Sequence, residues 1–317
     1  MNAVDTSGSA GSGARALVLC AGIAVLDFVF RVERFPTASA KSPMIDFAIT
    51  GGGCAANAAI AIARLGGRAR FAGPLGDDEH SARILDGLDR EGVDMCGVAR
   101  VPGADTSVSG IFVDAAGERL LTTRRSPGLG STKPADPERL LRGADLVLVD
   151  SHFPVFVTPV CAAARARDLP VVLDVDKPVE LSDPLLGLAS HPIFSAEALR
   201  AATGIDDPAR ALTAAARHCP GFAAVTDGDN GAYWRQPGEQ ALVLHQPAFK
   251  IKAADTLAAG DVFHAGFALA LAEGRPESEA MRFASAAAAL KCTRFGGIVG
   301  SPTRAEVEHL LSAVAAA

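Results

Sequence analysis

The stretch Asp255 to Asp261 reads Asp-Thr-Leu-Ala-Ala-Gly-Asp and combines small residues with two carboxylates just before a helix predicted over 261–272. A loop of small residues at a helix N-terminus directs several backbone N–H groups to one point, which favours an anion such as phosphate. A carboxylate beside phosphate is repelled unless it has a chemical task, and the obvious task is to accept a proton from an attacking hydroxyl. The stretch therefore predicts phosphoryl transfer to an alcohol. The simpler alternative is an Asp that only caps an ordinary helix.

A second stretch of small residues, Gly51-Gly52-Gly53-Cys54-Ala55-Ala56-Asn57, precedes a helix predicted over 55–65. Its first, third and sixth residues fit the G-x-G-x-x-A pattern of dinucleotide sites, but the acid expected at the end of the next strand is missing. The other interpretation is that the glycines let a sugar lie against the backbone, while Asn57 offers the sugar hydroxyls a donor and an acceptor. We favour the sugar.

Both stretches resemble signatures of the PfkB or ribokinase family of carbohydrate kinases, Asp-Thr-x-Gly-Ala-Gly-Asp and Gly-Gly-x-x-Ala-Asn. The resemblance runs from about Leu17 to the C-terminus and implies an ATP-dependent sugar kinase. It implies that Asp261 is the base, that the phosphoryl group meets the N–H groups of the preceding residues, and that the sugar meets the second stretch. The implied catalytic residues are Ala258, Ala259, Gly260 and Asp261, and the implied sugar contacts are Gly52, Gly53 and Asn57.

Ala258 departs from the family, which usually has Gly at this position. If the position needs a positive φ, the methyl group costs roughly 0.5 to 1 kcal/mol or more. This departure bears on catalytic efficiency more than on the existence of the site.

Two acidic residues at predicted strand ends are further candidates for sugar binding. Asp27 closes the first predicted strand, and a carboxylate at the carboxyl edge of a parallel strand can accept two sugar hydroxyls. The resemblance also implies a substrate-binding Asp there. Asp150 ends the run LVLVD and is a candidate for the same reason, whereas the nearby His152 is more simply explained as structural.

The resemblance also implies where ATP binds. Residues 226–232 match a Thr-x-Gly-x-x-Gly-Ala turn that lies against the nucleotide phosphates in the family, although a bare Gly-x-x-Gly turn is usually a hairpin. The sequence contains no Walker A motif. The predicted nucleotide contacts are Thr226, Gly228, Gly231, Ser195 and Thr256.

Two cations enter through the same resemblance. Ser195 and Ala198 replace the family's Asn-x-x-Glu pair, which is linked to magnesium, so we expect Mg²⁺ to arrive with ATP and to be held by phosphate oxygens and water. Asp255 and the segment 291–300 resemble the region where many members bind a monovalent cation such as K⁺.

The elements that must position these residues alternate along the chain. Apolar strand-like runs and Ala- and Leu-rich helical runs predict an α/β fold with a doubly wound, mainly parallel sheet flanked by helices, here ribokinase-like. The predicted strands cover 17–25, 69–72, 146–149, 171–175, 193–195 and 223–226. The predicted helices cover 55–65, 80–91, 137–141, 159–166, 196–202, 208–218, 261–272, 277–291 and 304–315.

Two segments, about 28–50 and 104–125, interrupt this alternation with strand-length runs and turns but no helix. They predict a small antiparallel sheet, which in an enzyme can cover the substrate and exclude water; the resemblance identifies it as a lid. Exposed lid edges commonly pair, so we expect a homodimer through the lid. The domain organisation is a disordered leader over 1–14 and one kinase domain over 15–317 that contains the lid segments.

Composition excludes several classes of protein. The net charge of −6 leaves no basic stripe for nucleic acid, and the six cysteines show neither zinc-site nor disulfide spacing. The apolar run 16–26 is too short to span a membrane and lacks the features of a signal peptide. We therefore expect a cytoplasmic enzyme whose partners are a sugar and ATP, with neither membrane nor nucleic acid.

The sequence leaves the substrate open between a neutral ketose or related sugar, sulfofructose and a nucleoside. Several stretches are similar to the sulfofructose kinase branch, while Asp-Thr-Leu is similar to ketohexokinases. A sulfonate would require fixed cations, for which Lys41, Arg124 and Arg125 are the candidates. The scarcity of aromatic residues disfavours a nucleoside base. A catalytically weak sugar-binding protein is the alternative from another class.

Overall fold

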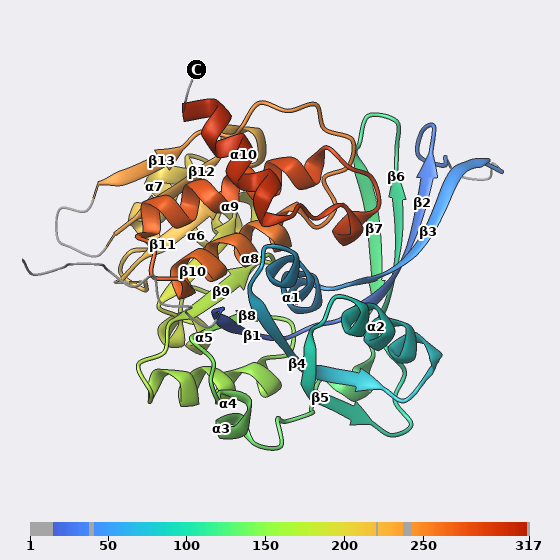
Figure 1. The fold of residues 1–317 in the computed structure, drawn as a ribbon, viewed down its shortest axis with the longest axis horizontal. Coiled ribbons are helices and arrows are strands. Elements are labelled where there is room, and N and C mark those ends of the chain that lie inside the picture. The colour runs from blue at the N-terminus through green and yellow to red at the C-terminus, as the bar shows by residue number, and fades with distance from the viewer. Residues whose placement is uncertain (1–14, 38–40, 220, 237–241, 316–317) are drawn as a thin grey trace, which may run out of the picture.

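The computed structural model describes residues 15–37, 41–219, 221–236 and 242–315, so the predicted leader lies outside the described residues. A nine-stranded sheet has the order β13-β12-β11-β10-β9-β8-β1-β4-β5 (Figure 1). Its strands are β1 (Leu17–Ala21), β4 (Arg68–Gly76), β5 (Asp94–Val101), β8 (Leu146–Asp150), β9 (Val171–Val175), β10 (His191–Ser195), β11 (Ala223–Thr226), β12 (Ala232–Arg235) and β13 (Val243–Gln246).

The sheet is parallel from β5 to β11, and the strands β12 and β13 continue it as antiparallel partners. The doubly wound, mainly parallel sheet predicted from the sequence is thus confirmed. Strand β1 lies between β4 and β8, so the strand order changes direction there. In open α/β sheets, ligands bind at the carboxyl ends of strands beside such a point.

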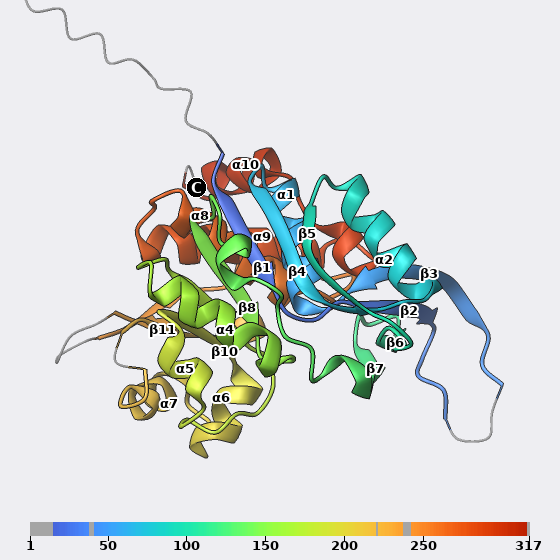
Figure 2. The same cartoon turned by 90° about the horizontal axis from the view of Figure 1, so that it is seen from below.

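Helices cover both faces of this sheet (Figure 2). One layer contains α1 (Cys54–Arg64), α2 (Glu79–Arg90), α8 (Ala259–Ala272), α9 (Glu277–Cys292) and α10 (Arg304–Ala315). The other contains α3 (Pro137–Leu140), α4 (Pro154–Arg165), α5 (Pro184–Leu188), α6 (Ala196–Thr203) and α7 (Pro208–Ala215).

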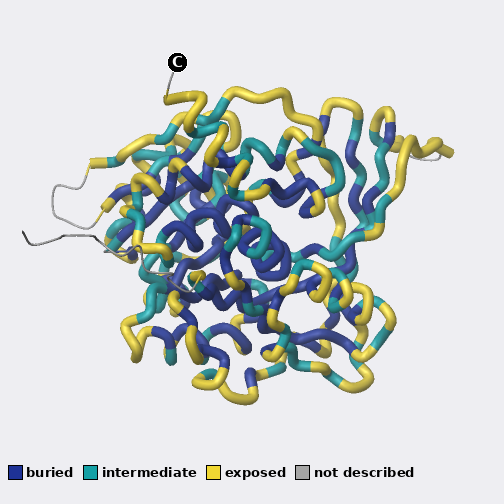
Figure 3. Tube along the Cα trace, viewed as in Figure 1, coloured by how far each residue is buried: buried dark blue, intermediate teal, exposed yellow. Residues whose placement is uncertain are grey.

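Successive residues of β1 explain why both layers are needed. Val18 and Cys20 belong to one apolar core and Leu19 and Ala21 to the other, and each of the four is 0% exposed. Side chains alternate between the faces of a strand, so a strand that is apolar throughout must be covered on both sides. Figure 3 shows the resulting buried centre in dark blue.

The predicted lid is a separate four-stranded sheet with the order β3-β2-β6-β7 (Figure 1). Its strands are β2 (Val25–Val32), β3 (Met44–Gly52), β6 (Val108–Val113) and β7 (Arg119–Arg124). The outer pairs are antiparallel, as expected, and the central β2–β6 pair is parallel.

The structure corrects one boundary that matters for the site. The first predicted strand, 17–25, ends at Ala21, and β2 of the lid begins at Val25. The chain bends at Gly22, where a Cβ atom would lie 2.0 Å from the Asp150 carboxylate. Asp27 therefore lies within a lid strand and not at the end of a core strand. The sequence did not indicate this, because the bend lies inside a continuous apolar run.

Among the described residues, no helix has the length and apolar character that crossing a membrane requires.

Candidate active site

Helix α8 and the loop before it provide the geometry of an anion site. The helix begins at Ala259, and Ala258 precedes it in the left-handed region at φ 64°. Within the described residues, the N–H groups of Gly260 and Asp261 have no hydrogen-bond acceptor. Gly260 is exposed, and a Cβ atom on it would meet no heavy atom within 4 Å outside its chain neighbours and the helix backbone, so a ligand can approach the turn on that side. Free N–H groups, open space and the positive end of the helix dipole suit a phosphate.

The two sequence signatures meet at this turn. Asn57 Nδ2 donates a hydrogen bond of 2.6 Å to Asp261 Oδ2, across 204 residues of chain. Asn57 is buried, and among the described residues its Oδ1 atom has no hydrogen-bond partner. An unpaired buried acceptor costs free energy unless a ligand supplies a donor. The amide is thus fixed by Asp261 on one side and available on the other.

The electrostatics of Asp261 suit a base that works near neutral pH. Burial raises the pKa of Asp261 to about 6, the hydrogen bond from Asn57 opposes this shift, and the charge of Asp176 adds to it. A carboxylate with this pKa is a stronger base than an ordinary aspartate but is still largely ionised at pH 7.

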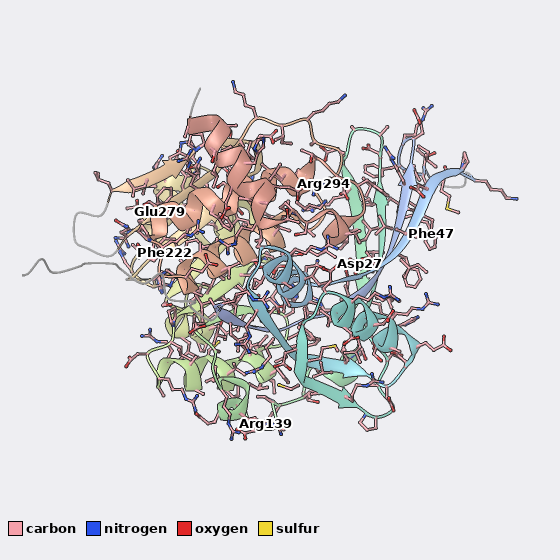
Figure 4. The ribbon with its side chains drawn as sticks, in the orientation of Figure 1. Asp27, Phe47, Arg139, Phe222, Glu279 and Arg294 are labelled. Atoms are coloured by element: carbon pink, nitrogen blue, oxygen red, sulfur yellow. The ribbon has the colours of Figure 1, made fainter. Side chains whose placement is uncertain are left out.

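Asp27 lies on the lid strand β2, near Asp261. Figure 4 labels Asp27, which is 6% exposed. Its partners in the strand register are Thr50 on β3 and Ser109 on β6. Burial raises the pKa of Asp27 to about 7; hydrogen bonding by Ser109 opposes the shift and the charge of Asp261 adds to it. A Cβ atom on Gly52 would lie 1.9 Å from Asp27 Oδ2. The glycine at position 52 therefore makes room for this carboxylate, and at Gly53 (φ 91°) a Cβ would lie 2.7 Å from the Ile23 carbonyl oxygen.

Asp150, a candidate for sugar binding, is held by three backbone N–H groups. Its Oδ2 accepts from the N–H groups of Ile23 (2.7 Å) and Ala55 (3.2 Å), and its Oδ1 accepts from the N–H group of His152 (2.9 Å). The side chain is 1% exposed. Asp150 therefore fastens the bend after β1 to the start of α1, and its oxygens are already engaged by the backbone.

Lys41 is also not brought to this group. It is exposed in the connection between β2 and β3, which lies at the end of the lid farthest from α8 in Figures 1 and 2. Of the other two lid cations, Arg124 pairs with Asp105 at 2.9 Å on the surface. Arg125 directly follows β7 and is exposed.

Two acids that were not predicted from the sequence lie near Asp261. Asp174 and Asp176 stand at the carboxyl end of β9; Asp176 Oδ2 lies 2.9 Å from His152 Nε2 and 3.5 Å from Cys54 Sγ. Although burial opposes the shift, the hydrogen bond with His152 lowers the pKa of Asp176, whereas burial raises that of Asp174. The strand-end rule that selected Asp150 also applies to the run VVLDVD and would have found both.

The predicted nucleotide contacts lie along the carboxyl edge of the sheet. Ser195 and Thr226 are neighbours in the register of β10 and β11. Ser195 Oγ accepts from the N–H group of Ala198 at 3.1 Å and so caps α6. Gly231 (φ 91°) is required by the fold, since a Cβ there would lie 2.1 Å from the Gln246 carbonyl oxygen.

Gly228 and Thr256, the other two predicted nucleotide contacts, have more open surroundings. A Cβ atom on Gly228 would meet open space. Thr256 is exposed, and its carbonyl accepts from Arg119 of the lid strand β7 at 3.1 Å.

The family model described as "pfkB family carbohydrate kinase" matches residues 15–304. The chain belongs to this family. It is an ATP-dependent carbohydrate kinase of the ribokinase and fructokinase type.

Known proteins are similar to this chain over almost its whole length. A ribokinase of Bacillus subtilis (strain 168) is 29% identical over 92% of this chain and 98% of the relative, and fructokinase-1 of Zea mays is 31% identical over 94% and 98%. A solved structure from Agrobacterium tumefaciens, provisionally described as a ribokinase, is 38% identical with a TM-score of 0.91 and covers 96% of this chain and 100% of its own. The ribokinase of Arabidopsis thaliana, solved with ribose and ATP, is 26% identical with a TM-score of 0.81, over 94% and 99%.

This member of the pfkB family places a lysine where we expected a monovalent cation. Lys291 Nζ donates to the Asp255 carbonyl oxygen at 2.8 Å and lies 3.3 Å from Asp255 Oδ2. Asp255 Oδ1 accepts from the N–H group of Leu257, and Oδ2 accepts from those of Gly296 and Gly297. The Asp255 oxygens that we expected to hold a cation are therefore engaged by backbone N–H groups and by the Lys291 ammonium.

Proposed function

We propose that this kinase transfers the γ-phosphoryl group of ATP to a primary hydroxyl of a small neutral sugar, with Asp261 as the base. One observation carries the proposal: Asn57 Nδ2 donates to Asp261 Oδ2 at 2.6 Å while Asn57 Oδ1 lacks a partner among the described residues. A residue expected to bind sugar and the residue expected to remove the proton thus share one contact at an open helix N-terminus.

The remaining groups have complementary tasks. Asp27 and Asn57 Oδ1 would accept hydrogen bonds from sugar hydroxyls and so orient the attacking oxygen. Asp261 would accept the hydroxyl proton as the new oxygen–phosphorus bond forms. The free N–H groups at the start of α8, including those of Gly260 and Asp261, would stabilise charge on the transferred group.

For ATP, we propose the edge formed by Ser195, Thr226, Gly228, Gly231 and Thr256. Open space in front of Gly228 and Gly260 leaves room for phosphates along this edge. Mg²⁺ would neutralise phosphate charge, and Asp174 and Asp176 are the carboxylates that we propose to hold it. Ligand atoms of Asp174 and Asp261 lie within 4.8 Å of each other and of Cys54 Sγ, and those of His152 and Asp176 form a second such group with Cys54. Magnesium prefers oxygen, so the carboxylates and not Cys54 are its expected ligands.

A ketose or ribose-like sugar is the substrate class we favour. The relatives are ribokinases and fructokinases, and ribose and fructose can both present a primary hydroxyl outside a five-membered ring. A structural neighbour described as a nucleoside kinase is 19% identical and supports the fold alone.

The test is an ATP turnover assay with ribose, fructose, other ketoses and aldoses, ribose 1-phosphate, sulfofructose and adenosine, followed by NMR of the product. Phosphorylation of a neutral sugar on its primary hydroxyl is the expected result. Exclusive turnover of adenosine, phosphorylation at a ring hydroxyl, or sugar binding without turnover contradicts the proposal.

A second candidate is a sugar that carries an anionic group. Lys177 Nζ donates to the carbonyl oxygen of Ser151, next to His152, at 2.8 Å. Burial and then the charge of Arg125 lower the pKa of Lys177, while the same charge opposes the rise in the pKa of His152, so these basic side chains lie on one side of the site. One relative, 32% identical, is an ATP-dependent ribose-1-phosphate kinase. If the substrate is anionic, Arg125→Ala should raise KM for ribose 1-phosphate or sulfofructose and leave KM for neutral sugars unchanged.

We further propose a homodimer that pairs through the lids, in a cytoplasmic enzyme. The lid exposes large apolar side chains, among them Phe47 on β3 (Figure 4). The whole set is Met44, Ile45, Phe47, Ile49, Leu120 and Leu121. A patch of this kind on a sheet is typical of a surface that another protein covers.

A further inference from the structure

Lys291 is a charged side chain with no access to solvent. It lies in the last turn of α9 and is 0% exposed. Its ammonium group donates to the carbonyl oxygens of Asp255 (2.8 Å) and Arg294 (3.4 Å) and lies 3.3 Å from Asp255 Oδ2. An ammonium has three protons to donate; here two carbonyl oxygens accept, and the Asp255 carboxylate forms an ion pair with the same group. A buried lysine is tolerated when it is paired and hydrogen-bonded in this way.

The same cluster fixes the loop that leads into α8. Asp255 Oδ2 also accepts from Gly296 (3.0 Å) and Gly297 (2.9 Å), and Oδ1 accepts from Leu257 (2.8 Å). The N–H groups of Ala254 and Asp255 donate to the carbonyl of Cys292 at the end of α9. One positive charge therefore joins the end of α9, the loop at 294–297 and the residues just before the anion-binding turn.

We propose that Lys291 is a built-in cation: its ammonium does what a bound monovalent metal ion would do, and the kinase therefore needs no K⁺. A K⁺ ion at this place would need the oxygens that Lys291 already contacts, and two cations sharing them would repel strongly in a buried setting. The lysine acts through the loop and touches neither sugar nor phosphate, so it is a positioning residue for the free N–H groups of Gly260 and Asp261.

The first test needs no variant. Turnover of wild-type enzyme is measured in KCl and in choline chloride at equal ionic strength, with potassium-free ATP. The two rates should agree within about twofold, because the site is already filled by a side chain. Activation by K⁺ of about tenfold or more overturns the proposal.

The second test compares Lys291→Ala, which opens a space, with Lys291→Met, which fills it without charge. In choline chloride both should lose about tenfold or more in turnover, because the turn before α8 loses its support. KCl should restore much of the rate of Lys291→Ala and little of that of Lys291→Met. Lys133→Ala, at an exposed lysine, is the matched control and should match wild type in both salts.

The melting temperature of the same proteins supplies a readout that does not depend on the sugar assignment. KCl should raise the melting temperature of Lys291→Ala relative to choline chloride and leave that of wild type unchanged. A Lys291→Ala enzyme that is fully active without K⁺ contradicts the proposal. A variant in which K⁺ restores neither rate nor melting temperature also contradicts it, since the lysine would then be a structural residue only.

Discussion

At the scale of single residues, the proposed catalysis depends on the ionisation of Asp261. Burial raises its pKa to about 6, and a base must be ionised to accept a proton. We therefore predict that kcat, measured at saturating sugar and ATP, falls by about tenfold per pH unit below pH 6 and levels off above about pH 7. A kcat that stays constant down to pH 5 would show that another group is the base.

Asp27 makes a prediction about stability. Burial raises its pKa from 3.8 to about 7, so the native state binds a proton that the unfolded state releases over this range. The associated stability is present below about pH 4 and is lost as pH rises through 7. Asp27→Asn should therefore be more stable than wild type at pH 8, by on the order of 2 kcal/mol, and about equal to it at pH 4.

Urea unfolding at the two pH values checks this. Asp86→Asn is the control, since Asp86 is exposed and pairs with Arg90 on the surface of α2. An Asp27→Asn variant whose stability relative to wild type is the same at both pH values contradicts the shift. A sugar-binding role for Asp27 would explain why a group that destabilises the free protein stands there.

At the scale of elements, the junction between the loop and α8 is held in a costly conformation. Ala258 has φ 64°, a region that favours glycine, and it belongs to the apolar core with 7% exposure. Glycine relieves the positive φ, so Ala258→Gly should raise the free energy of unfolding by about 0.5–1 kcal/mol. Because the methyl group packs in the core, kcat should change by less than about twofold.

The natural comparison is Gly274→Ala at the other end of α8, where φ is 79° and a Cβ would meet open space. That change should lower the free energy of unfolding by about 1 kcal/mol. A large rise in kcat for Ala258→Gly would instead show that the methyl group crowds the phosphate.

How far the sequence predicts these elements depends on whether the signal is local. The helices beginning near Asn57 and Asp261 follow from composition and capping within a few residues, and α10 matches its predicted bounds. The sheet bend at Gly22 lies inside an unbroken apolar run, so the position of Asp27 on a lid strand was not predictable from periodicity. Strand β5 was not predicted for a different reason: its charged residues and its glycine interrupt the apolar pattern of a buried strand.

In the site, too, local sequence signals were predictable and contacts between distant residues were not. The two signatures were recognisable, but their contact joins residues 204 positions apart and depends on how α1 and α8 pack. The roles of Asp150 and Lys291 depend on backbone groups from distant loops, and no sequence pattern records those.

At the scale of the whole molecule, the exposed apolar side chains of the lid predict self-association. Phe47→Asp places a charge among them and should convert a dimer to a monomer in sedimentation velocity, because burying an unpaired charge is costly. Val314→Asp replaces another exposed apolar residue on α10, away from the lid, and should leave the dimer intact. Wild-type protein that sediments as a monomer at every concentration would contradict the lid interface.

The most direct test of the account is Asp261→Asn. The asparagine keeps the shape of the side chain but cannot accept the hydroxyl proton, so kcat should fall by about 10² to 10⁴. The dissociation constant for ATP, measured by calorimetry, should stay within about threefold, because the N–H groups that face the phosphate are unchanged. Turnover within tenfold of wild type would contradict the central claim that Asp261 is the catalytic base.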